Sequence, residues 1–186
     1  MKEILEPRRA FFRDLGIGAA AFALLSNGCD LYSHDGDNTP SGFDLADYPD
    51  MFTDYSNFNG RIVVGSTAIA SDVIAAVDIA QGLYLQGIEP GATVLDTELS
   101  DLEQNLIIIG RPDSNPLVSN YTLPSLNPGE GLLKIVNHND YAHLIVSGYD
   151  PESTRVAAKV LANHQDYALS GPEAITIGDL ANPMLK

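Results

Sequence analysis

One stretch of the chain, residues 61–81, constrains the fold more than any other. It reads RIVVGSTAIASDVIAAVDIAQ: a β-branched apolar run that ends at Gly65, a short polar loop, and an apolar-periodic segment that opens at Ser71-Asp72. This order predicts a strand, a glycine turn and a helix. Two weaker versions follow downstream, LIIIGRPDSNPLVSNY and LIVSGYDPESTRVAAKVLA. Three such units predict an α/β domain.

The patterns between these units refine the expected fold. The continuous apolar run 106–109 is typical of a strand buried in a parallel sheet. Two β-rich runs, 131–137 and 141–147, predict one hairpin around His138-Asn139-Asp140, and further short strands are expected over 93–99 and 174–177. We therefore expect an α/β, three-layer, Rossmann-like or flavodoxin-like sheet, mostly parallel with one hairpin, with helices on both faces.

Both expected helices carry apolar faces. The first, from about Ser71 to Leu85, has an apolar stripe, and its alanines allow close approach to a sheet. The residues of this stripe are Val73, Ile74, Val77, Ala80, Leu83 and Tyr84. The second helix opens at Pro151-Glu152-Ser153, where a proline and an acid favour the first turn, and it should turn Val156, Val160 and Leu161 to the sheet.

The first 28 residues have the pattern of an export signal rather than of a fold. Arg8 and Arg9 stand in PRRAFFR, which matches the twin-arginine pattern, and the apolar run LGIGAAAFALL is too short for a comfortable transmembrane helix. The segment LSNGC then resembles a lipoprotein processing box, which predicts lipidation of Cys29. A signal peptide cleaved nearby and an uncleaved amino-terminal anchor are the alternatives.

The predicted organisation is a signal peptide over 1–28, an acidic flexible tether over 29–47 and one α/β domain over 48–186. The tether is rich in Asp, Gly, Ser, Asn and Pro. Its carboxylates leave weak surface binding of calcium open, but no EF-hand register is present, and a solvated linker is the preferred interpretation.

Charge and cysteine content exclude several classes of protein. Lys and Arg number 10 against 25 Asp and Glu, a formal net charge of −15. Such a field repels polyanions, so nucleic acid is not an expected partner. The single cysteine excludes an intrachain disulfide framework and a multi-cysteine metal site.

The candidate ligand loops follow the three glycine-ended strands. They comprise Gly65, Ser66, Gly110, Arg111, Gly148 and Tyr149. A glycine turn into a helix start exposes amides that suit anions, but the first loop is neither a dinucleotide fingerprint nor a Walker loop, and no lysine follows it. Capping of the helix by Ser71 and pairing of Arg111 with Asp113 are the preferred interpretations. No catalytic residue and no cofactor are predicted.

Two histidines flank the predicted hairpin turn. His138 and His143 could approach each other across it, with Asp140 as the nearest further ligand for a metal. Turn histidines are more often exposed to solvent, and no metal site is predicted.

These features together resemble one known family. The succession FNGRIVVGSTAIASDVIAAVDIA, LSDLEQNLIIIGRPDSNPLV, GEGLLKIV and HLIVSGYDPESTRVAAKVLANHQDYALSG looks like the α/β domain of archaeal surface-layer (S-layer) proteins, over about residues 48–177. The resemblance implies a structural role in the cell envelope and brings no catalytic residues. The chain departs from it in being much shorter than a lattice-forming protein and in its lipoprotein-like amino terminus.

The expected function is therefore that of a cell-envelope structural or adhesive module, S-layer-like, outside the cytoplasm and at the cell surface. Its expected partners are the membrane, through a lipid anchor, and other envelope or S-layer proteins, including further copies of itself. The chain is not expected to be an enzyme. The main alternative is a tethered, extracytoplasmic protein that binds a small ligand with the glycine-ended loops, and an extracytoplasmic enzyme is a third.

Overall fold

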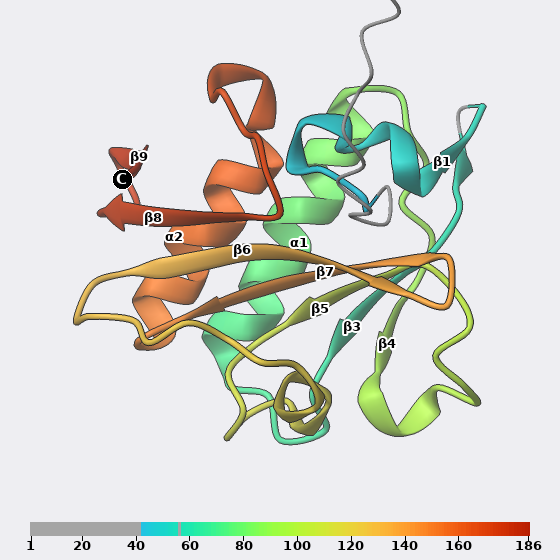
Figure 1. Ribbon diagram of the computed structural model, residues 1–186, viewed down its shortest axis with the longest axis horizontal. Helices are drawn as coiled ribbons and strands as arrows, with labels where there is room; N and C mark the ends of the chain where they lie inside the picture. The colour runs from blue at the N-terminus through green and yellow to red at the C-terminus, as the bar shows by residue number, and fades with distance from the viewer. Residues whose placement is uncertain (1–41, 56) are drawn as a thin grey trace, which may run out of the picture. The chain divides into compact units, whose positions relative to one another are not determined.

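The computed structural model describes residues 42–55 and 57–186, which contain a seven-stranded sheet, a two-stranded sheet and two α-helices (Figure 1). The main sheet has the order β4-β3-β5-β7-β6-β8-β9. Its strands are β3 (Arg61–Val64), β4 (Thr93–Leu95), β5 (Leu106–Ile109), β6 (Gly131–His138), β7 (Tyr141–Gly148), β8 (Glu173–Gly178) and β9 (Pro183–Leu185). The small sheet pairs β1 (Thr53–Asp54) with β2 (Asn57–Phe58), and the helices are α1 (Ala70–Leu85) and α2 (Pro151–Ala162).

The strand pairing corrects the expected fold class. β4, β3, β5 and β7 form three parallel pairs, whereas β6, β8 and β9 add three antiparallel pairs. The domain is thus a mixed α/β fold, and the prediction of a mostly parallel, three-layer, Rossmann-like or flavodoxin-like sheet is wrong. Consecutive strands can lie parallel in a sheet only when a crossover connection joins them. After β5, however, the chain forms the antiparallel hairpin of β6 and β7, and after α2 it returns as β8, which pairs antiparallel with β6.

The placement of the helices corrects a second part of that prediction. Both α-helices pack on one face of the sheet, against each other and against one core cluster (Figure 1). The opposite face is covered by irregular chain and by the short 3-10 turn η4 (Pro116–Asn120), which contributes buried Val118. The 21 residues between β5 and β6 contain this turn but no α-helix, so the second layer of helices is missing.

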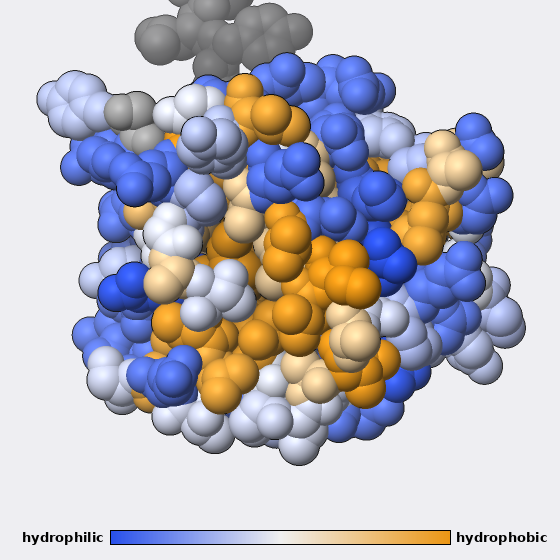
Figure 2. Space-filling view, turned by 180° about the vertical axis from the view of Figure 1, so that it is seen from behind, coloured by the Kyte–Doolittle hydropathy of each residue, from blue (hydrophilic) through white to orange (hydrophobic). Residues whose placement is uncertain are grey.

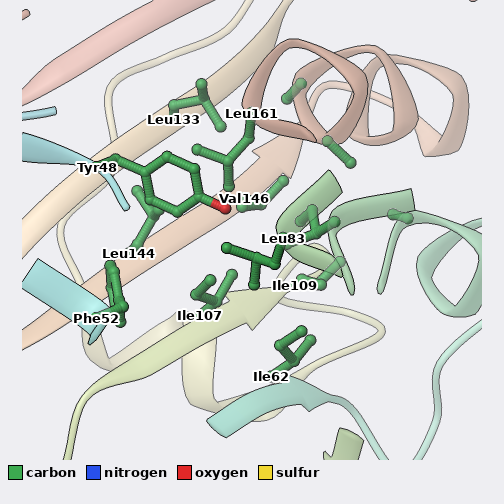
Figure 3. Close-up of a cluster of buried hydrophobic side chains, with 14 of the residues drawn as sticks. Tyr48, Phe52, Ile62, Leu83, Ile107, Ile109, Leu133, Leu144, Val146 and Leu161 are labelled. Carbon is green, nitrogen blue, oxygen red and sulfur yellow. The ribbon is translucent and has the colours of Figure 1, made fainter. Parts of the chain in front are cut away.

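The alternation of side chains along the parallel strands builds both layers of the core. On β5, Ile107 and Ile109 face the helices while Leu106 and Ile108 face the irregular layer, and all four are fully buried. Figure 3 shows the helix-side cluster, where Tyr48 and Phe52 lie beside side chains of the sheet and helices. Full burial of each large apolar side chain contributes about 1.5–3 kcal/mol, so this double-sided strand is central to stability.

The packed domain begins before the predicted boundary at residue 48. Leu45 is 1% exposed, and Phe43 packs against the same cluster. The Asp44 carboxylate accepts hydrogen bonds from the backbone N–H groups of Ala46 and Gly171, both at 2.8 Å. Residues 43–47 therefore belong to the fold, although their composition resembles that of the predicted tether.

Helix α1 turns a different face inward from the one that the sequence predicts. The buried residues include Ala75, Ala76, Ile79 and Leu83, whereas most of the predicted stripe faces solvent. Small residues are buried because α1 lies very close to α2: a Cβ on Gly82 would stand 2.4 Å from the carbonyl oxygen of Ala162. The bulkier valines and isoleucine on the other side do not fit such a contact.

The hairpin is where the sequence predicted the structure best. β6 and β7 pair antiparallel over their full lengths, around Asn139 and Asp140. These two residues have φ of 49° and 71°, the left-handed conformation that a tight two-residue hairpin turn requires. The predicted strand over 174–177 is confirmed within β8, while β9, which begins at a proline, was not predicted.

Candidate functional site

The three strand-ending glycines of the sequence lie along one edge of the sheet, here called the strand-end edge. The parallel register aligns Val64 of β3 with Ile109 of β5, and Ile109 with Val146 of β7. Gly65 and Gly110 therefore directly follow β3 and β5, and Gly148 is the last residue of β7, all at the same end of the sheet. In open α/β sheets this is the edge at which ligands bind, so its geometry decides whether this domain can bind one there.

Gly65 is covered by the chain itself. A Cβ at this position would stand 1.9 Å from the carbonyl oxygen of Ser114 and 2.6 Å from the Cα of Asn115. The Thr67 hydroxyl donates a hydrogen bond to the same Ser114 oxygen at 3.1 Å. The loop after β5 thus lies directly against the end of β3, in the space where a ligand would approach a glycine turn.

The covering loop, residues 110–116, is held by its own polar groups. The Asn115 side chain donates to the carbonyl oxygen of Ile109 at 2.8 Å and accepts from the backbone N–H of Leu117 at 3.2 Å. The Ser114 hydroxyl accepts from the backbone N–H of Arg111 at 3.1 Å. Both side chains belong to buried residues, so they stabilise the loop and are not available to bind a ligand.

The end of β7 is closed by helix α2. A Cβ on Gly148 would stand 2.4 Å from the backbone nitrogen of Thr154, so the helix packs onto the glycine. Asp150 caps this helix, and its Oδ1 accepts from the backbone N–H of Ser153 at 2.8 Å and from the Ser153 hydroxyl at 2.7 Å. The pKa of Asp150 is lowered most by the backbone N–H of Ser153 and next by the Ser153 hydroxyl. The nearby charge of Arg111 lowers it further. An ionised carboxylate therefore occupies the start of α2.

A second carboxylate occupies the first turn of α1. Asp72 is 0% exposed, and neither of its side-chain oxygens has a hydrogen-bond partner among the described residues. It points toward β5, since a Cβ on Gly110 would stand 3.3 Å from its Oδ2. A helix amino terminus favours negative charge, and here the protein's own carboxylate lies where a bound anion would be stabilised. Sequence reasoning identified Asp72 as part of a helix start but missed this role.

The other candidate loop residues also have partners in the chain. Arg111 pairs with Asp113, with 2.6 Å between Nη2 and Oδ2, which confirms the predicted pair. Its Nη1 lies 3.5 Å from the Tyr149 carbonyl oxygen, which links the loops after β5 and β7. The backbone N–H of Ser66 donates to Asp96. The predicted cap by Ser71 is wrong, because α1 begins one residue earlier with Ile69 at the N-cap position.

A shallow hollow beside the strand-end edge is open to solvent. It has a volume of about 480 Å³ and is lined by Ser71, Asp150, Pro151, Glu152, Arg155 and Leu180. The guanidinium of Arg155 is already close to the Asp78 carboxylate of α1, at 4.0 Å. The hollow therefore offers a surface with charges of both signs rather than an enclosed site.

The two hairpin histidines meet, as the sequence suggested, but one of them is buried. The rings of His138 and His143 stack with their centroids 4.7 Å apart. His143 is 0% exposed; its Nε2 lies 3.1 Å from the carbonyl oxygens of Leu102 and Gln104, and its Nδ1 lies 2.6 Å from the Tyr121 hydroxyl. Burial, reinforced by His138, lowers the pKa of His143.

This network suits a neutral imidazole that donates from Nε2 and accepts the Tyr121 hydroxyl at Nδ1. The expectation that the turn histidines are exposed is thus wrong for His143. In residues 42–55 and 57–186, no group of three or more His, Cys, Asp or Glu side chains could hold a metal ion.

The predicted export and lipidation residues, Arg8, Arg9 and Cys29, lie outside the described residues. Within the described part of the chain, no helix is both long enough and apolar enough to cross a membrane. No protein-family model matches the chain, and a search of curated proteins finds no significant match.

Proposed function

We propose that this domain is a structural or adhesive module of the cell envelope, S-layer-like, tethered to the membrane through Cys29. The observation that carries the proposal is the closure of the strand-end edge by the chain's own groups. The Ser114–Asn115 backbone covers Gly65, and the carboxylates of Asp72 and Asp150 occupy the two helix starts. An edge that is filled in this way supports packing rather than the binding of a ligand.

Entry of a ligand at this edge would be costly. It would have to displace the buried loop 110–116 and leave the amide of Asn115 without its two backbone partners, and each buried polar group left unsatisfied costs about 1–3 kcal/mol. The buried side chain of Asp72 in addition fills the space at the start of α1 that an anionic ligand would need. These costs favour the structural role over the tethered ligand-binding role.

The positions of the polar residues also support a non-enzymatic role. Ser66 follows β3 at the strand-end edge, whereas His143 is paired with Leu106 at the opposite ends of the parallel strands. His143 is moreover enclosed by Tyr121 and two carbonyl oxygens. A nucleophile and a base must lie within hydrogen-bond reach of each other, and these two do not.

The open hollow at α2 supports a second candidate function. Its lining places Glu152 and Asp150 beside Arg155, an arrangement suited to a small ligand that carries both charges. In this second function the domain would still be tethered outside the cytoplasm, but it would bind a small ligand instead of other envelope proteins.

The proposed setting is tested first at the export signal. We expect Arg8→Lys combined with Arg9→Lys to reduce the envelope-associated protein roughly tenfold or more, because the twin-arginine pair is read by its own export route. The measurement is an immunoblot of cell fractions. Arg61→Lys, an exposed arginine at the start of β3, is the matched control and should leave export unchanged. Continued export of the double-lysine variant would exclude the twin-arginine route.

A further inference from the structure

Helix α1 presents an apolar face to solvent. Its exposed side chains are Val73 (48% exposed), Ile74 (41%), Val77 (58%), Tyr84 (70%) and Leu85 (76%). We call these five residues the α1 face. Figure 2 shows apolar surface gathered in the middle of the side that carries the helices. Because the opposite side of α1 is also apolar, the helix is hydrophobic nearly all round, which is the composition of a helix buried on every side.

The α1 face carries no exposed charge. The only ionisable carboxylates of the helix are Asp72, which is fully buried, and Asp78, which lies against Arg155 of α2. Gln81 supplies an uncharged polar group beside the apolar residues. In a chain with a net charge of −15, two copies repel each other over most of their surfaces. A contact through the α1 face brings no exposed carboxylate of α1 itself toward the partner.

The size of this face is close to what a specific interface needs. Ile69, the N-cap residue of α1, is 39% exposed and extends the apolar surface beyond the five residues of the α1 face. Together the six side chains expose on the order of 600 Å², at the upper end for the largest apolar patch of a monomer. A standard protein interface buries about 800 Å² on each partner, so a polar rim would supply the rest.

The shape of the face suits a copy of itself. The slimmer Val73 and Ile74 lie at one end and the bulkier Tyr84 and Leu85 at the other, about 17 Å apart along the helix axis. When two such helices pack antiparallel, each bulky end meets a slim end of the partner. A twofold axis near Val77 and Gln81 produces this arrangement, and closed dimers of this symmetry are the commonest soluble oligomers.

We propose that the α1 face is the contact surface between two copies of this chain, packed antiparallel about that axis. A lipid surface is a poorer occupant, because helices that lie in membrane interfaces carry Lys or Arg beside their apolar face and α1 has neither. This dimer contact would be one way in which the domain serves the proposed envelope role. The observations that support the contact come from α1 and do not depend on that role.

The test measures self-association of the domain over residues 42–186, which contains its own core. Sedimentation velocity at increasing concentration should show a monomer–dimer equilibrium. Val77→Lys should weaken the dimer roughly tenfold or more, because it places two like charges close together on either side of the axis, within the apolar contact. Met184→Lys, at a half-exposed apolar residue of β9, is the matched control and should leave the equilibrium unchanged. Circular dichroism confirms that the variants are folded.

A mixture of Val77→Lys and Val77→Glu chains should recover dimers, because in this geometry the two copies of residue 77 flank the twofold axis about 6 Å apart along the helix, close enough for opposite charges to pair. A wild-type domain that stays monomeric at the highest concentration would overturn the proposal, as would equal effects of the two lysine variants. Binding of the monomer to neutral phosphatidylcholine vesicles, lost on Val77→Lys, would show that lipid is the occupant instead. These measurements are independent of the export and anchoring experiments. The dimer can therefore be disproved without disproving the envelope role, and the envelope role can be disproved without disproving the dimer.

Discussion

Gly65→Val should unfold the domain or bring it close to unfolding. The added side chain would collide with the backbone of Ser114 and Asn115, and backbone atoms cannot move aside as a flexible side chain can. Overlap of this kind costs more than about 4 kcal/mol, against a total stability of about 5–15 kcal/mol for a typical domain. Urea denaturation followed by circular dichroism measures the loss.

This variant separates the two interpretations of the strand-end edge. If Gly65 serves packing, valine destabilises the whole fold; if it served a ligand, valine would block binding and leave the fold intact. Ser66→Ala is the matched control, because Ser66 is exposed and its contact with Asp96 is made by the backbone N–H, which alanine keeps. It should change the free energy of unfolding by less than about 0.5 kcal/mol. Wild-type stability of Gly65→Val would show that loop 110–116 is not packed as described.

Cys29→Ser should move the protein from the membrane fraction to the soluble fraction almost completely. A lipid on the cysteine, with a diacylglyceryl group and a second chain, would hold the protein firmly, and serine removes the thiol to which the lipid is attached. The measurement is an immunoblot of carbonate-washed membranes and of the soluble extracytoplasmic fraction.

Ser33→Ala, four residues beyond the cysteine, controls for a general effect of substitution in this segment and should keep the protein on membranes. A Cys29→Ser variant that stays in washed membranes would mean that the chain has another anchor. In that case the uncleaved amino-terminal segment would be the anchor to examine next.

Local structure could be predicted from the sequence wherever the pattern was strong. The run 106–109 became a fully buried strand, and Asn139-Asp140 became the hairpin turn, because these segments depend on neighbours within a few residues. The pairing of Arg111 with Asp113 was local in the same sense.

The topology depended on longer connections and was predicted wrongly. Each glycine-ended strand suggested another parallel βα unit, but residues 116–120 form only a 3-10 turn, and the hairpin of β6 and β7 follows it. Without a helix in that connection, the second helical layer cannot form. Periodicity alone does not show whether a short apolar segment after a proline will extend into a full helix.

The inward face of α1 could not be predicted from hydrophobicity. Both sides of the helix are apolar, and the side that packs is the one where Gly82 lets α2 approach closely, while Ile79 and Leu83 fill the core beside that contact. The closure of the strand-end edge also could not be predicted, because it depends on residues far apart in the sequence. Asp72 and Ser114 lie 42 positions apart, and folding brings both next to Gly110.

The central claim, that this domain works outside the cytoplasm on the cell surface, is tested most directly by thiol labelling of intact cells. Cys29 is the only cysteine of the chain, and a lipid would block its thiol, so Ser119→Cys at an exposed position of η4 introduces the one free thiol. A membrane-impermeant maleimide should label this variant before the cells are lysed. Labelling that occurs only after lysis would contradict the proposed location and, with it, the envelope role.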